Sequence, residues 1–302
     1  EALLALAASS RAGFNAMMAQ TGLACDFSAT GKLVLYADAA SFASAQRQML
    51  LQRALGSVQE AVTAEQCVTI EPALQSQAPR IAGAIHTPSE CAADCFKVCE
   101  GLETALRARG VRFLMATEVT RLVTNGGRVC AAQSSVGAIE ADAFVLAMAT
   151  GSVRLARDLG IRLPVYPLKG YSVTVQAAAE RAAAPQVNVT DAARKIVFAR
   201  LGDRLRIAGM AELVGNDTHI PDARITALLA AGREIFPYAS DYGALDRWAG
   251  LRPATPTGLP IVGTLCRAPA NLLFNTGHGA LGFTLAFGTA QALLAPLRAA
   301  DR

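Results

Sequence analysis

Hydrophobic and polar residues alternate along many short stretches of the chain, which is the pattern of half-buried β-strands. The alternation over residues 165–175, 195–199 and 204–211 is typical of neighbouring strands in an antiparallel sheet. Further stretches predicted as strands are 31–36, 81–86, 111–115, 117–124 and 128–134. The Asn125-Gly126-Gly127 turn predicts that the last two of these form a hairpin.

Other stretches carry the spacing and end signals of helices. Helices are expected over residues 1–21, 40–55, 63–73, 94–109 and 222–235. Thr63 is placed to cap the third of these, and Gly110 follows the fourth, where a glycine ends a helix.

Two apolar runs follow neither pattern. Residues 141–148 are continuously apolar after the first two positions, as in a buried parallel strand, and a helix is expected to begin after residues 149–151. Residues 271–275 predict a strand, and residues 283–297 predict a helix after it. The uncharged stretch 279–297 is about as long as a membrane span, but its glycines favour a helix buried beneath a sheet.

Composition excludes several classes of protein. The chain of 302 residues is 52% hydrophobic and 17% charged, which favours a globular protein over a disordered one. Its net charge is +4 without a run of lysine or arginine, so no nucleic-acid partner is expected. The apolar start of the chain is short and lacks a basic region, so no secretory signal is predicted.

The seven cysteines indicate reduced thiols in a cytoplasmic protein, because their number is odd and their spacing forms no disulfide framework. Cys91, Cys95 and Cys99 are spaced wider than the usual ligands of a metal. We therefore expect these cysteines to pack in or near the core, and we predict no metal site.

One glycine pattern resembles a nucleotide-binding motif. The run Gly277-His278-Gly279-Ala280-Leu281-Gly282 has the G-x-G-x-x-G spacing, between a predicted strand and a predicted helix. Only one helix follows it, so no βαβ unit can close around it. The pattern alone therefore does not predict a phosphate-binding loop.

The order of elements favours a mixed fold, α/β plus α+β. Alternating strands and helices, which favour a parallel sheet, lie at residues 94–160 and 248–302. Residues 1–93 and 161–247 have the antiparallel pattern and are interleaved with them. These four segments predict two domains.

Several motifs, in order along nearly the whole chain, resemble the FAD-dependent oxidoreductases of the D-amino-acid oxidase superfamily, D-amino-acid dehydrogenase in particular. They are IEPAL at 70–74, VYPLKGYS at 165–172, GMAELVG at 209–215, WAGLRP at 248–253, TPTGLPIVG at 255–263 and NTGHGALGFT at 275–284. The resemblance implies a doubly wound FAD-binding domain at 94–160 and 248–302, and an antiparallel-sheet substrate domain at 1–93 and 161–247. It also implies that the N-terminal βαβ unit with the family's own G-x-G-x-x-G turn is missing, so the chain alone is expected to bind FAD weakly or not at all.

The same resemblance implies the site residues. Arg252 is expected to hold the substrate carboxylate through a bidentate guanidinium, unless it forms a structural ion pair. Tyr171 is expected to line the substrate side of the flavin, and His278 to contact the flavin or the pocket; packing roles are the alternatives for both. Lys169 is expected to be a solvated charge at a strand edge, with an electrostatic role on the substrate side as the alternative. The residues expected to contact FAD are Val119, Thr150, Gly151, Gly250, Gly277, His278, Gly279, Leu281, Gly282, Phe283 and Thr284.

The implied function is oxidation of a D-amino acid to an imino acid, with hydride transfer from Cα to flavin N5 and electrons passing to a quinone. The nearest alternative is a glycine- or sarcosine-type oxidase that uses oxygen. A non-catalytic fragment that binds a partner is the third. The cysteines indicate a cytoplasmic location, and the resemblance adds peripheral attachment to the inner face of the cell membrane.

Overall fold

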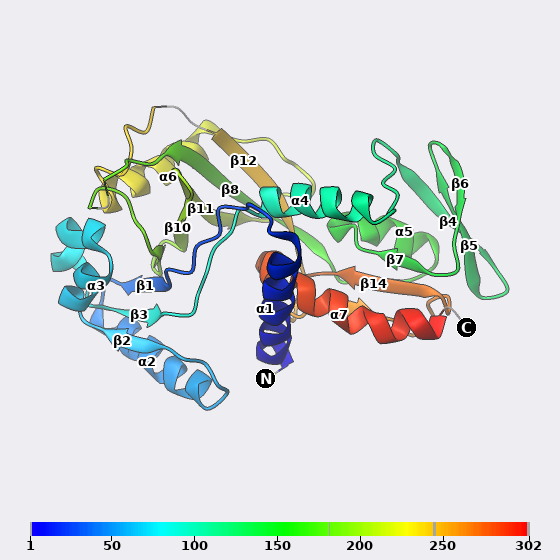
Figure 1. The fold of residues 1–302 in the computed structure, drawn as a ribbon, viewed down its shortest axis with the longest axis horizontal. Helices are drawn as coiled ribbons and strands as arrows, with labels where there is room; N and C mark the ends of the chain where they lie inside the picture. The colour runs from blue at the N-terminus through cyan, green and yellow to red at the C-terminus, as the bar shows by residue number, and fades with distance from the viewer. Residues whose placement is uncertain (1, 181, 244–245, 301–302) are drawn as a thin grey trace.

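The computed structural model describes residues 2–180, 182–243 and 246–300, and within them the chain forms three sheets (Figure 1). The largest has eight strands, in the spatial order β12 (Asp246–Ala254), β8 (Tyr166–Gln176), β11 (Arg204–Glu212), β10 (Ile196–Leu201), β9 (Asn188–Asp191), β1 (Lys32–Tyr36), β3 (Gly83–Thr87) and β2 (Glu60–Val62). The second has β13 (Ile261–Gly263), β14 (Leu272–Thr276) and β7 (Phe144–Leu146). The third has β4 (Val119–Asn125), β5 (Arg128–Ser134) and β6 (Gly137–Glu140).

The helices lie between and around these sheets. The α-helices are α1 (Ala2–Thr21), α2 (Ala39–Arg53), α3 (Ala64–Ile70), α4 (Cys95–Ala108), α5 (Ser152–Asp158), α6 (Asp222–Ile235) and α7 (Gly282–Ala300). The 3-10 helices are η1 (Pro72–Arg80), η2 (Ala149–Gly151) and η3 (Gly279–Leu281). The predicted mixed α/β class is confirmed by this arrangement and by the solved structures described below.

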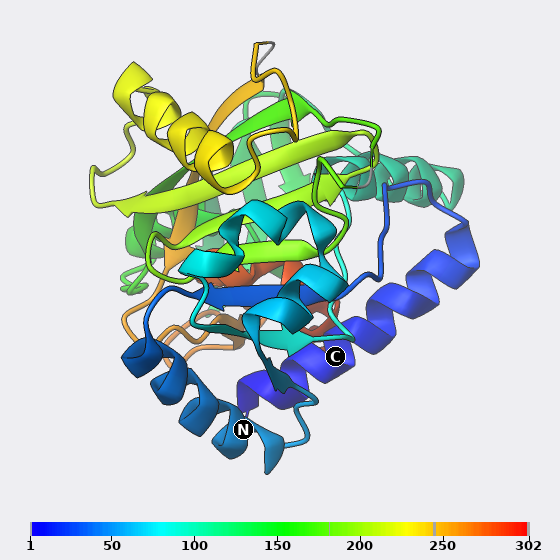
Figure 2. The same cartoon turned by 90° about the vertical axis from the view of Figure 1, so that its left-hand side faces the viewer.

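The core of the large sheet lies between its strands and α6, which covers one face (Figure 2). Apolar residues at helical spacing on α6, Ile225, Leu228 and Ile235, are buried against Val173 of β8 and Ile207 of β11. Burial of these side chains removes apolar surface from water and fixes the helix on the sheet. We call this side of the sheet the α6 face.

The pairing of β8 with β12 is the longest in the sheet and has no bulge: Asp246 pairs with Thr174, and Ala254 with Tyr166. Since paired residues of antiparallel strands point to the same side, Arg252 shares a face with Leu168 and Gly170. Tyr171 and Val173 point to the α6 face instead. We call the opposite side the Arg252 face.

Most predicted elements are confirmed, including the capping box at the start of α3, in which Thr63 accepts from the backbone of Gln66. The predicted strand over residues 111–115 is wrong. No strand pairs with this segment, and Phe113 packs beneath the guanidinium of Arg107 on α4. Strands β2, β6, β9, β12 and β13 were not predicted from the sequence. Pro253 argued against a strand over the residues of β12, because proline cannot donate a backbone hydrogen bond. Strand β12 lies at the edge of the sheet, where proline is tolerated.

Two expectations about burial need correction. Helix α7 packs on α1, β13 and β14, but only one of its faces, with Leu285, Thr289 and Leu293, is buried. The window Gly279–Arg298 is long and apolar enough to cross a membrane and is 22% buried, so the prediction of a helix buried beneath a sheet holds for one face only.

The cysteine prediction is also only partly correct. Cys91 is half-buried, whereas Cys95 and Cys99 are exposed because they lie in the first turns of α4, away from its packed side. In the described part of the chain no three His, Cys, Asp or Glu side chains gather as metal ligands.

Candidate active site

Two short loops and the end of one strand meet at one place in the fold. Helix η2 follows β7 and helix η3 follows β14, and these two strands are parallel neighbours. Their carboxyl ends therefore lie at the same edge, which is where ligands of such sheets bind. Both η2 and η3 contact β12, the strand that carries Arg252. The predicted FAD-binding residues at 150–151 and 277–284 and the predicted carboxylate anchor, Arg252, are thus brought together.

Arg252 lies across the neighbouring strand. Its Nη1 donates a 3.0 Å hydrogen bond to the carbonyl oxygen of Met210 on β11, so the side chain spans β8. A Cβ atom on Gly170 would lie 2.2 Å from the guanidinium nitrogens, so only glycine leaves room for this path. Burial lowers the pKa of the guanidinium, which nonetheless stays charged at neutral pH.

No carboxylate forms an ion pair with Arg252 among the described residues. The alternative of a structural ion pair therefore finds no support in this part of the chain. A half-buried guanidinium whose one protein partner is a carbonyl oxygen keeps several N–H donors for a ligand, and a carboxylate is the group that fits its fork.

Trp248 lies beside Arg252 on the same face. A Cβ atom on Gly250 would be 2.0 Å from the indole, so the ring lies directly over that glycine. Gly250 and Gly170 are paired in register, so the indole and the Arg252 guanidinium lie over two neighbouring glycines. The predicted contact of Gly250 with FAD stays a prediction; in the structure this glycine accommodates Trp248.

The glycines of the 277–282 loop serve the turn. Gly277 and Gly279 have φ values of +77° and +55°, which suit glycine, and a Cβ atom on Gly277 would lie 2.7 Å from the methyl group of Thr255. No side chain caps η3, so backbone N–H groups at the start of α7 remain available to a ligand. Gly282 is helical, with φ of −52°.

His278 points toward α7. Its Nε2 lies 3.2 Å from the hydroxyl of Thr289, and that hydroxyl donates to the carbonyl oxygen of Ala286. The threonine oxygen therefore accepts, and His278 donates from Nε2. Burial lowers the pKa of the imidazole, so the ring is neutral at pH 7. These contacts support the packing role, and a contact of His278 with the flavin stays a prediction.

The structure does not bring Tyr171 to Arg252. The phenol lies on the α6 face, 99% buried, and donates a 2.5 Å hydrogen bond to Glu212. Burial and this hydrogen bond raise its pKa above the usual range. The expectation that Tyr171 lines the substrate side does not fit this position, because strand alternation directs the side chain away from Arg252.

Lys169 is not the solvated charge that was expected. It shares the α6 face with Tyr171, is 1% exposed, and donates to Asp217 and to the carbonyl oxygen of His219. The carboxylate of Asp217 and the carbonyl oxygen of His219, both in the segment that follows β11, satisfy the ammonium. A position in a strand therefore did not imply exposure.

The remaining predicted FAD contacts lie on both sides of the two loops. Thr150 and Gly151 form η2, and Gly151 is exposed. Val119 begins β4, and its carbonyl oxygen accepts a 2.9 Å hydrogen bond from Arg154. Neither position contradicts the prediction, which stays a prediction.

Leu281 is the last residue of η3, Phe283 and Thr284 lie in the first turn of α7, and all three are exposed. Phe283 packs edge-on against Phe14 of α1, with ring centroids 6.0 Å apart. Phe283 and Thr284 also line a cavity of about 330 Å³ between α1, residues 89–93 and α7, with Arg11 among its other walls.

The site fits a flat, anionic cofactor such as FAD. The backbone is not crowded at Gly279 and Gly282, where a Cβ atom would have its nearest neighbour at 4.0 and 3.8 Å. The start of α7, which no side chain caps, favours negative charge. Met148 and Leu281, at η2 and η3, expose apolar surface that suits a ring system. Thr150, Gly151 and residues 277–284 are the ones that would hold it.

Sequence reasoning missed Trp248 and Gly170 as site residues. Both lie in motifs that carried the resemblance, but the strand β12 was not assigned. Had it been, the spacing of Trp248, Gly250 and Arg252 at every second residue would have placed them on one face.

Known proteins resemble the chain over most of its length. The family model of FAD dependent oxidoreductases matches residues 1–295. The chain is 46% identical over 303 residues to D-amino acid dehydrogenase 2 of Ralstonia nicotianae, covering 96% of the chain and 70% of that protein. It is 45% identical over 269 residues to D-amino acid dehydrogenase 2 of Pseudomonas aeruginosa, covering 89% and 62%.

Solved structures share the fold. Glycine oxidase from Bacillus cereus superposes with a TM-score of 0.86 at 21% identity, covering 98% of the chain and 81% of that structure. L-proline dehydrogenase from P. horikoshii superposes with a TM-score of 0.84 at 18% identity, covering 97% and 82%. The chain spans between 62% and 70% of the length of the two dehydrogenases. From the extent of the family match and of these identities, the chain belongs to the FAD dependent oxidoreductase family.

Proposed function

We propose that the chain belongs to an enzyme that oxidises D-amino acids with FAD, forming an imino acid that water hydrolyses to a 2-oxo acid and ammonia. The observation that carries the proposal is Arg252, a half-buried guanidinium without a carboxylate partner in the described residues, beside the loops that fit a flavin. The relatives named above, which are D-amino acid dehydrogenases, support the substrate class.

In this proposal Arg252 binds the substrate α-carboxylate with the N–H groups that Met210 leaves free. Bound FAD supplies the acceptor for the hydride that leaves Cα. The indole of Trp248 shields the anchor from water on one side, which strengthens the ion pair. The residues of this site thus act by orienting the substrate and by electrostatics. A substrate whose amine is already uncharged when it binds needs no side chain to remove a proton from it.

We propose further that electrons pass from the flavin to a quinone instead of oxygen. Support comes from the names of the relatives, which are dehydrogenases at 45–46% identity, whereas the glycine oxidase likeness at 21% concerns the fold. Oxidation of a D-amino acid with a soluble quinone under nitrogen tests this step. Stoichiometric hydrogen peroxide under air, without stimulation by quinone, would favour an oxygen-using oxidase.

The anchor is tested with Arg252→Lys in the FAD-loaded enzyme. Lysine keeps the charge but loses the fork, so KM for a D-amino acid should rise at least about tenfold, or about 1.4 kcal/mol. Arg247→Lys is the matched control, since Arg247 is on the same strand but pairs with Asp222. An unchanged KM in Arg252→Lys would remove Arg252 from the proposed role.

A further inference from the structure

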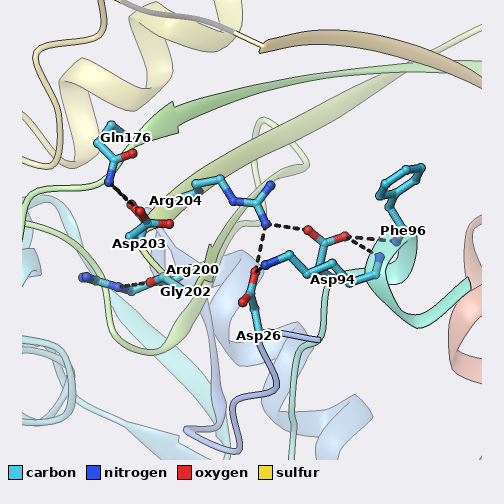
Figure 3. A network of polar contacts seen from close by, with 9 residues as sticks. Asp26, Asp94, Phe96, Gln176, Arg200, Gly202, Asp203 and Arg204 are labelled. Carbon is cyan, nitrogen blue, oxygen red and sulfur yellow. Dashed lines mark hydrogen bonds and ion pairs between the residues drawn. The ribbon is translucent and has the colours of Figure 1, made fainter. Parts of the chain in front are cut away.

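A second arginine on the Arg252 face lacks a carboxylate partner. Along β11, Arg204 and Arg206 point to the same side because they are two residues apart. Arg204 forms ion pairs with Asp26 and Asp94, at 2.8 and 2.6 Å (Figure 3). Arg206 forms no ion pair among the described residues, and its guanidinium lies over the indole of Trp248, with the guanidinium carbon 5.4 Å from the ring centroid.

The two arginines without carboxylate partners extend over β8 from opposite sides. Arg252 starts on β12 and reaches Met210 on β11, whereas Arg206 starts on β11 and reaches Trp248 on β12. Between them, β8 offers Gly170 and Ser172, which are among the smallest side chains. Gly170 pairs with Gly250 on β12, and Ser172 pairs with Ala208 on β11 and with Trp248 on β12. The floor beneath the two guanidiniums is therefore made of small residues, with the indole of Trp248 at its edge.

Ser172 gives an independent sign of an incomplete site. Its side chain is 1% exposed, and its hydroxyl oxygen is buried without a hydrogen-bond partner among the described residues. Such a group costs free energy unless a ligand or an ordered water satisfies it. Ser172 lies directly between Trp248 and Ala208 in the sheet, on the Arg252 face.

We infer that the two guanidiniums above this floor bind a dicarboxylic amino acid, with its α-carboxylate on Arg252 and its side-chain carboxylate on Arg206. The inference rests on the proposed function and names its substrate class. Two partnerless cations on one face attract two anionic groups of one ligand. A substrate with an aromatic side chain fits this place less well, because it would have to stack on the indole of Trp248. One part of that ring already lies against Gly250, and Arg206 covers its surface.

The first test compares D-glutamate with its neutral isostere D-glutamine in the FAD-loaded enzyme. Arg206→Gln should lower kcat/KM for D-glutamate by about ten- to a hundredfold and leave that for D-glutamine within about twofold, since a charge-assisted hydrogen bond is lost for one substrate only. Arg233→Gln is the matched control: its guanidinium also lies over an aromatic ring, that of Tyr242, but it belongs to α6. Equal losses for both substrates, or no loss, would overturn the inference.

The second test measures binding without turnover. Calorimetry with glutarate, which has two carboxylates, and butyrate, which has one, should give at least about tenfold tighter binding of glutarate, and Arg206→Gln should abolish the difference. Equal affinities in the unaltered protein would overturn the inference. An enzyme that oxidises D-glutamine but discriminates against D-glutamate contradicts the inference alone, whereas an enzyme that oxidises no D-amino acid contradicts the proposed function.

Discussion

The hydroxyl of Thr276 donates a 2.9 Å hydrogen bond to the carbonyl oxygen of Ala149 and so joins the loop after β14 to the loop after β7. Thr276 is 1% exposed, and Ala149 has a φ of +50°, an uncommon value for a residue with a Cβ atom. This contact therefore holds together the two loops that fit the cofactor.

Thr276→Val removes the hydrogen bond and keeps the shape of the side chain. The carbonyl oxygen of Ala149 then loses its partner, and we expect a loss of about 1–2 kcal/mol in the free energy of unfolding. FAD should also bind more weakly, because η2 is no longer held to β14. Urea unfolding and flavin titration measure the two effects. Thr120→Val, which removes the 3.2 Å bond of an exposed threonine, should change neither.

Gly170→Ala tests the path of Arg252. The added methyl group would overlap the guanidinium, which must then leave the surface of β8. We expect KM for a D-amino acid to rise at least about tenfold, with a smaller effect on the unfolding temperature. Gly243→Ala is the control, since its nearest neighbour would lie 3.6 Å away. A normal KM in Gly170→Ala would show that the position of Arg252 does not control binding.

Glu71 is a buried carboxylate that organises the backbone around it. It is 0% exposed and accepts from the N–H groups of Ala73, Gln186 and Val187. Glu71→Ala leaves these donors without the carboxylate, and we expect a loss of about 3 kcal/mol or more in the free energy of unfolding. The exposed Glu140→Ala is the comparison, and a similar small change in both variants would contradict the expectation.

The ion pairs of Arg204 predict a pH dependence of stability. Hydrogen bonds, first from Lys97 and then from Arg204, hold the pKa of Asp26 below its usual range. Burial alone would raise the pKa of Asp94, but the hydrogen bond and charge of Arg204, together with the backbone N–H groups of Lys97 and Phe96, outweigh burial and lower the pKa. Both folded-state pKa values lie below the unfolded value of roughly 3.9, so the stabilisation is complete above that pH and is lost as pH falls through the folded pKa values.

We therefore expect Arg204→Met to lower the unfolding temperature at pH 7 and to have less effect at pH 3. Thermal unfolding followed by circular dichroism between these pH values measures this. Asp158→Asn, at an exposed carboxylate without an ion pair in the described residues, serves as the comparison. A constant difference between Arg204→Met and the unaltered protein at all pH values would exclude these ion pairs as its source.

The sequence predicted the elements whose pattern is local and missed those set by distant neighbours. Helix α6 was predicted with its bounds, because its apolar residues repeat at helical spacing. Strand β9 is short and polar, and it forms because β1 and β10 flank it. No local pattern carries that information.

The candidate site divides in the same way. Arg252 and the 277–284 loop were identified from their motifs, and the structure brings them to one end of β12. The faces of Tyr171 and Lys169 depend on the register of β8 with its neighbours, which the motif does not contain. The sequence also does not show which arginine of β11 lacks a carboxylate partner. Asp26 and Asp94, which pair with Arg204 and leave Arg206 without one, lie 178 and 110 positions from Arg204 in the chain.

The unbroken pairing of β12 with β8 fixes the position of Arg252 along the sheet and the face to which its side chain points. Deleting one residue between Trp248 and Arg252 would turn the anchor toward the α6 face, since side chains alternate. Deleting two would restore the face but draw the anchor about 6.6 Å along the strand. Homologues with length changes within β12 should therefore be rare, whereas the turn at residues 255–259, beyond the paired stretch, should tolerate them.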